Sequence, residues 1–120
     1  MNDSKWGNRL FAAIDGKDAA AFADFLTEDA VFRFSNAAPV SGRAAIREAV
    51  AGFFTSIRAL RHEVTDAWTL PDAVIAVGQV TYTRHDGTTL SVPFADVFRM
   101  RGELAREYLI YVDASRLYAP

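Results

Sequence analysis

Apolar residues at helical spacing predict three helices in the first half of the chain. The first runs from a capping Ser4 to Gly16 and places apolar side chains four positions apart: Trp6, Leu10 and Ile14. A second, short helix is expected over Ala19–Leu26, with Asp18 as its N-cap. The third is strongly amphipathic and covers roughly Arg43–Ala59, with apolar residues at i, i+4, i+7 and i+11: Ile46, Val50, Phe53 and Ile57.

The rest of the pattern alternates with the two-residue period of β-strands. One strand, Ala30–Phe34, precedes the third helix, and the segment 37–42 between them has the Pro39 and Gly42 of a loop. Turn signals then leave four strands that are joined as antiparallel neighbours: His62–Thr69, Ala73–Arg84, Thr88–Met100 and Glu103–Asp113. This order predicts an α+β fold, in which a curved, largely antiparallel sheet wraps around N-terminal helices into a cone with an internal pocket.

Asp96 stands in the middle of an apolar strand face. Every second residue of the stretch 90–100 points to one side, and Asp96 shares that side with Leu90, Val92, Phe94, Phe98 and Met100. Burial there would either require an ion pair, with an arginine such as Arg84 or Arg106, or raise the pKa of the carboxyl for acid/base chemistry. Pro93 in the same strand predicts a bulge or a sheet edge, and a bulge would reverse the facing of the residues before it.

Further side chains are candidates for the pocket. His62 opens the first strand of the meander and would exchange protons with a substrate if its face points inward; the alternative is a histidine at a helix-to-strand junction. A ligand-binding wall is expected from seven residues: Trp6, Phe34, Asn36, Phe54, Trp68, Tyr82 and Tyr108. Their structural alternatives are core packing for the aromatic residues and a turn for the asparagine.

Composition argues against several kinds of partner and site. With 120 residues, 51% of them hydrophobic, the chain is expected to form a single domain over 1–120. A net charge of −2 without a basic stripe argues against nucleic acid as a partner. The absence of cysteine and the isolated positions of the two histidines argue against a metal site. No apolar run is long enough for a membrane span or a signal peptide, so a cytoplasmic protein without membrane contact is expected.

Three segments, GRAAIREAV, VTYTRHDG and VPFADVFRMRGEL, in this order of elements resemble the nuclear transport factor 2-like superfamily, with its cystatin-like cone, and in particular its SnoaL-like branch. The resemblance implies that Asp96 stands at the position of the oxyanion donor of ketosteroid isomerase and of the acid/base aspartate of SnoaL-type cyclases. The base and the tyrosine of the isomerase would fall at Phe34 and near Leu10, so neither is present.

Limonene epoxide hydrolase, a member of the same superfamily, gives a second comparison. Of its tyrosine and asparagine at the end of the first strand, only the asparagine is present here, in Phe34-Ser35-Asn36. Its three charged positions on the sheet would fall at Gly78, Val80 and Ile110. The resemblance therefore implies the fold of this hydrolase but not its mechanism.

Together these observations predict a small-molecule enzyme that uses no cofactor. It would act as an isomerase, cyclase, dehydratase or hydrolase on an apolar cyclic or carbonyl-bearing substrate, with Asp96 as acid/base and His62 beside it. The alternative is a non-catalytic module of the same fold that binds a small ligand or another protein. Leu109 and Tyr111 lie on the opposite face of the last strand, and the resemblance also implies a homodimer through this outer sheet face.

Overall fold

The computed structural model describes residues 5–118. In chain order its elements are α1 (Lys5–Asp15), α2 (Ala19–Ala23), β1 (Leu26–Phe34), β2 (Val40–Ser41), α3 (Arg43–Thr55), β3 (Ala59–Leu70), β4 (Ala73–Thr83), β5 (Thr89–Arg101) and β6 (Leu104–Val112). The expected cap Ser4 lies outside the described residues. No helix between residues 5 and 118 combines the length and the apolar character that a membrane crossing needs.

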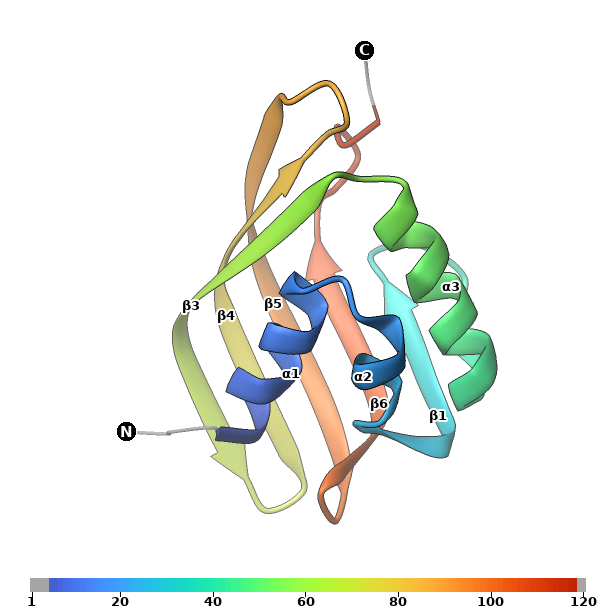
Figure 1. The fold of residues 1–120 in the computed structure, drawn as a ribbon. Coiled ribbons are helices and arrows are strands. Elements are labelled where there is room, and N and C mark those ends of the chain that lie inside the picture. Colours follow the sequence, from blue (N-terminus) through green and yellow to red (C-terminus); the bar gives the residue numbers. More distant parts are fainter. Residues whose placement is uncertain (1–4, 119–120) are drawn as a thin grey trace.

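The predicted α+β fold is confirmed. Six strands form one curved sheet in the order β2-β1-β6-β5-β4-β3. The meander β3 to β6 is antiparallel, whereas β1 joins its edge parallel to β6. Figure 1 shows α1, α2 and α3 on one face of this sheet, which curves toward them. The core lies between the helices and the concave face, where four of the predicted apolar helix positions are buried, Leu10, Ile14, Ile46 and Val50, and two are partly buried, Trp6 and Phe53. The third helix ends at Thr55, earlier than expected, so the buried Ile57 lies in the segment that follows it.

The first strand begins earlier than the sequence pattern suggests. The helix expected over Ala19–Leu26 ends at Ala23, and Leu26 is already paired with Ala105 of β6. The backbone N–H of Ala105 also donates to the carbonyl of Phe25 (2.8 Å). Pairing with a strand that lies far away in sequence therefore overrides the helical tendency of this short segment.

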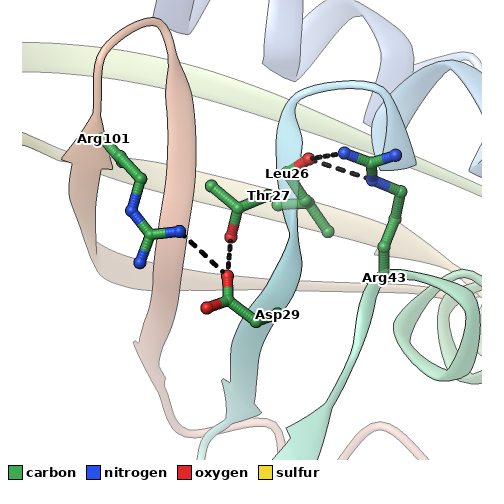
Figure 2. A network of polar contacts seen from close by, with 5 residues as sticks. All are labelled: Leu26, Thr27, Asp29, Arg43 and Arg101. Carbon is green, nitrogen blue, oxygen red and sulfur yellow. Dashed lines mark hydrogen bonds and ion pairs between the residues drawn. The ribbon is translucent and has the colours of Figure 1, made fainter.

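Side-chain hydrogen bonds hold this early part of β1 (Figure 2). Arg43, at the start of α3, donates from Nε and Nη2 to the carbonyl of Leu26, at 3.0 and 2.8 Å. Asp29 accepts from Thr27 (2.8 Å) and from Arg101 at the end of β5 (3.1 Å). One end of β1 is thus tied both to the helix that follows it and to the hairpin between β5 and β6.

The β5 face that contains Asp96 keeps its alternation along the whole strand. Pairing with β4 is regular through Gln79 and Pro93, so the bulge considered at Pro93 is not there. Pairing with β6 begins only at Phe94, which lies opposite Val112. Pro93 consequently stands where β5 has a neighbour on one side, and its missing N–H removes no bond to β6. The prediction of a local edge is correct.

A bulge does occur in β3, and it corrects one prediction. Val64 pairs with Gly78, but the next pair is Asp66 with Val77, which leaves Thr65 as an extra residue. An extra residue reverses the facing of everything beyond it. Trp68 therefore pairs with Ile75 on the convex face, where it is 43% exposed, and its expected place in the pocket wall is wrong.

Gly78 is required where this bulge crosses β4. A Cβ added there would lie 2.0 Å from the carbonyl oxygen of Glu63, which is closer than atoms can approach. Gly78→Ala should lower the free energy of unfolding by about 2 kcal/mol or more, because β3 must move away. Urea unfolding measures this change. Gly52→Ala on α3 is the control, since its Cβ meets nothing within 4 Å, and equal effects of both substitutions would contradict the prediction.

Candidate active site

A cavity of about 210 Å³ lies between the concave face of the sheet and the helices. Much of its wall consists of phenylalanine rings: Phe22, Phe32, Phe34, Phe53, Phe54 and Phe94. Among the described residues that line it, four have polar side chains: His62, Tyr82, Asp96 and Tyr108. The site is therefore an apolar chamber with a few groups that can donate or accept a proton.

Asp96 lies at the centre of β5, opposite Ala76 on β4 and Ile110 on β6, and is 1% exposed. Its Oδ2 accepts a hydrogen bond from the Tyr108 hydroxyl at 2.8 Å. Its Oδ1 is buried and has no hydrogen-bond partner within residues 5–118. Burial raises the pKa of Asp96 to about 7, although the bond from Tyr108 acts in the opposite direction. The carboxyl can therefore exist in both protonation states near neutral pH.

The ion-pair interpretation of Asp96 is wrong. Arg84 donates elsewhere, to the carbonyls of Leu117 (2.8 Å) and Arg116 (3.0 Å) in the C-terminal segment. Arg106 is exposed. Within the described part of the chain Asp96 takes part in no ion pair, so desolvation of its charge is not compensated by a cation.

Tyr108 is held rigidly by other aromatic rings. Its ring stacks on Phe98, with centroids 4.3 Å apart and planes at 26°, and it contacts the rings of Phe22 and Phe32. Burial, together with the neighbouring charge of Asp96, keeps the pKa of Tyr108 well above its ordinary value. The phenol thus remains a hydrogen-bond donor to Asp96.

His62 lines the same cavity from β3. β3 begins at Ala59, so His62 lies within the strand and not at its junction with the helix. The imidazole lies against the rings of Phe11 and Phe94, with centroids 4.8 and 5.1 Å away. Its Nδ1 is hydrogen-bonded to Oδ1 of Asp15, the last residue of α1, at 2.7 Å. Its Nε2 has no hydrogen bond to any residue that the structure describes.

The structure brings some expected wall residues together and not others. Phe34, Phe54 and Tyr82 line the cavity with Asp96. Trp6 does not, because its indole Nε1 donates to the carbonyl of Glu103 (2.8 Å) and its ring packs against Phe25 and Phe98. Asn36 is exposed in the turn after β1 and borders a groove on the other face of the sheet, together with Tyr111. The pocket positions expected for Trp6 and Asn36 are therefore wrong, as is that of Trp68.

Asp15 is a residue of this site that sequence reasoning missed. A carboxylate in the last turn of a helix is opposed by the helix dipole, so its position was a weak signal that it has a partner elsewhere. The partner, His62, lies 47 residues further along the chain. No three histidine, aspartate or glutamate side chains of the described residues gather into a metal-binding group.

Fold and cavity together define a class of protein: a curved sheet covered by helices that encloses a small apolar chamber with a buried carboxyl. Residues 8–108 match the family described as the SnoaL-like domain, and the chain belongs to this family. No curated protein sequence matches the chain significantly.

Solved structures with the same fold share little sequence with the chain. A hypothetical protein with a ketosteroid isomerase-like fold from Catenulispora acidiphila, in complex with trimethylamine, is 21% identical, with a TM-score of 0.84 over 92% of this chain and 86% of the other. TerC co-crystallised with polyporic acid is 18% identical, with a TM-score of 0.82 over 95% and 93%. A candidate SnoaL-like polyketide cyclase from a Jannaschia species is 18% identical, with a TM-score of 0.82 over 100% and 99%.

The raised pKa of Asp96 predicts that stability falls with pH. Between about pH 4 and pH 7 the unfolded chain ionises this group while the folded chain keeps it protonated. The contribution of this residue to stability should therefore be complete at and below about pH 4, and about 4 kcal/mol of it should be lost by pH 8. Asp96→Asn removes this loss, because the amide carries no charge at any of these pH values.

Urea unfolding of wild type and Asp96→Asn at about pH 5 and about pH 8 measures the effect. The difference in unfolding free energy should shift in favour of the variant as the pH rises. Asp24→Asn, which changes an exposed carboxylate just after α2, is the control and should follow wild type. A difference between Asp96→Asn and wild type that stays constant with pH would show that the carboxyl is not desolvated.

Proposed function

We propose that the chain is a cofactor-independent acid/base enzyme for a small, largely apolar substrate that is cyclic or contains a carbonyl group. The observation that carries this proposal is the carboxyl of Asp96, which lines an apolar cavity with one oxygen bound by Tyr108 and the other without a partner. A carboxyl with a pKa of about 7 can give or take a proton near neutral pH, which is the condition for general acid/base catalysis.

The volume of the cavity limits the size of the substrate. Its volume of about 210 Å³ lies below the roughly 300–1,000 Å³ that is common for drug-sized ligands. A molecule with one or two rings fits a cavity of this volume better than a four-ring skeleton does. Apolar walls favour a ring system with few polar substituents, and the few polar side chains select where its oxygen lies.

Asp96 and His62 can divide the chemistry between them. Because the Tyr108 hydroxyl donates to Oδ2, the proton of the neutral carboxyl belongs on Oδ1, where it can donate to a substrate carbonyl oxygen. His62 can then remove a proton from the carbon next to that carbonyl. Returning the proton to another carbon gives isomerisation, whereas attack of the resulting enol on a second carbonyl gives cyclisation.

The structural relatives support a small-molecule site of this kind. One was solved with trimethylamine, another with polyporic acid, and a third is a candidate polyketide cyclase. The SnoaL-like fold includes cyclases, isomerases and epoxide hydrolases, so the reaction has to be argued from the side chains. Phe34 in the cavity and Leu10 in the core replace the base and the tyrosine of ketosteroid isomerase, and this favours a reaction other than steroid isomerisation.

Turnover should depend on Asp96. Against a panel of cyclic ketones, epoxides and polyketide mimics, Asp96→Asn should lower kcat by about 10²-fold or more and leave ligand affinity by calorimetry little changed. Asp24→Asn, at an exposed position just after α2, should retain the wild-type rate. If Asp96→Asn turns over substrate as fast as wild type per folded molecule, or if panel members bind wild type and none reacts, the catalytic assignment fails and the non-catalytic binding module is the better account.

We also propose that the convex face of the sheet binds a second copy of the chain. Apolar residues form a row across four strands, in which each member pairs with the next: Trp68, Ile75, Val97 and Leu109. A second row runs through Val77, Ala95 and Tyr111, with Asp66 on β3 as its polar end, and Tyr111 is 58% exposed. The ion pair between Arg99 and Glu107 (3.0 Å) lies on the next positions of the sheet and gives this patch a charged border. Such an apolar patch with a polar border is typical of an isologous interface.

A substitution at the centre of this patch should separate the copies. Tyr111→Glu places a charge in the proposed interface and should reduce the mass found by analytical ultracentrifugation from that of a dimer to that of a monomer. Tyr118→Glu changes an exposed tyrosine of the C-terminal segment and should leave the mass unchanged. A wild-type monomer at micromolar concentration would rule out this interface.

A further inference from the structure

Asp15 makes two hydrogen bonds to the same residue. Its Oδ1 contacts the Nδ1 of the His62 ring at 2.7 Å, and its Oδ2 accepts the backbone N–H of His62 at 2.9 Å. The two bonds join the end of α1 to the first part of β3, the strand at the edge of the sheet. The side chain of His62 is 9% exposed and that of Asp15 is 26% exposed, so the contact lies between the cavity and the solvent.

We propose that Asp15 is the positioning residue that makes His62 a proton acceptor toward the cavity. This inference rests on the proposed function, because it assigns the direction in which His62 works in that same site. An ionised carboxylate accepts hydrogen bonds and donates none, so the neutral imidazole must place its proton on Nδ1. The lone pair then lies on Nε2, the ring nitrogen without a described partner.

The surroundings of the ring support a single orientation. Phe11 from α1 and Phe94 from β5 pack against the imidazole, and the bond from the His62 backbone to Asp15 fixes the carboxylate relative to the strand. A half-turn of the ring would place a carbon atom where Nδ1 meets Asp15 and would lose that bond. His62 is therefore held with one nitrogen committed to Asp15 and the other available to a ligand.

This arrangement gives the two proton-exchanging residues opposite roles. In the first step the substrate C–H bond breaks, its proton goes to Nε2 of His62, and the electron pair forms the carbon–carbon double bond of an enol. The carbonyl oxygen accepts the proton from Oδ1 of Asp96. In the return step each residue recovers its original state, so no net proton is consumed. Asp15 stabilises the imidazolium that exists between the two steps.

The backbone bond makes Asp15→Asn an unusually informative variant. The His62 N–H still needs an acceptor, so the amide oxygen must take that position. The amide NH₂ then faces Nδ1 and donates to it. The proton of the neutral ring must consequently move to Nε2, which turns His62 from an acceptor into a donor on the cavity side.

Two-bond ¹H–¹⁵N correlation spectra of histidine-labelled protein test this directly, at a pH at which both imidazoles are neutral. The sequence contains two histidines, and the second provides an internal reference. His85 Nε2 lies 2.8 Å from the carbonyl of Thr55, to which it can only donate, so this ring should show the Nε2–H form. Wild-type His62 should show the Nδ1–H form. Asp15→Asn should invert His62 alone, and the exposed Asp24→Asn should change neither ring.

The outcomes separate this inference from the proposed function. A wild-type His62 in the Nε2–H form, or a His62 that keeps its form in a folded Asp15→Asn, would overturn the inference without any substrate. The wild-type spectrum decides the matter even if the variant fails to fold.

Kinetics add a second readout for any panel substrate that wild type converts. Asp15→Asn should lower kcat by about 10²-fold or more with little change in KM, because the base is lost and the cavity is not. An inverted ring with unchanged kcat would overturn the inference. Inversion together with a wild type that converts no panel member would confirm the positioning of the proton and count against the proposed function alone.

Discussion

Among the described residues, only Tyr108 donates a hydrogen bond to the buried carboxyl of Asp96, and the second carboxyl oxygen has no partner. The properties of the site follow from this shortage of hydrogen bonds. Tyr108, which donates the bond, is fixed by aromatic rings such as Phe98 and Phe22. Asp96 is itself only 1% exposed, and this burial desolvates its charge. Desolvation lowers the stability of the folded chain when Asp96 ionises, and it also brings the pKa into the range in which the group can exchange protons.

Helix α1 fixes the other side of the cavity, where His62 lies, because the helix is attached to the sheet at both ends. Near its start the Trp6 indole donates to the carbonyl of Glu103, in the hairpin between β5 and β6. At its end Asp15 binds His62 on β3. Lys17, in the turn that follows, donates to the carbonyls of residues 57 and 58 (3.0 Å each). The position of His62 in the cavity therefore depends on a helix that is fixed at several points, as a rigid site requires.

Local periodicity was sufficient to predict much of the architecture. The repeat along α1 and α3 and the alternation along β5 report which face is buried, whatever the partner is. They predicted the α+β class, the four-stranded meander and the burial of Asp96. The apolar neighbours of Asp96 also predicted the direction of its pKa shift, because two-residue spacing places them on its own side of the strand.

Tertiary structure decided what depends on pairs of distant residues. The bulge at Thr65 has no hydrophobic signature, yet it moves Trp68 to the convex face. Pairing of β1 with β6 turns the segment from Leu26 onward into strand, although its local pattern is compatible with a helix. Tyr108, and no arginine, contacts Asp96, and Asp15 meets His62 across 47 positions of sequence. Sequence alone thus determined which faces of α1, α3 and β5 are buried, because hydrophobic periodicity records burial along a regular element. Only the folded chain decided where a bulge reverses a strand face and which side chains meet, because periodicity carries no information about the partner.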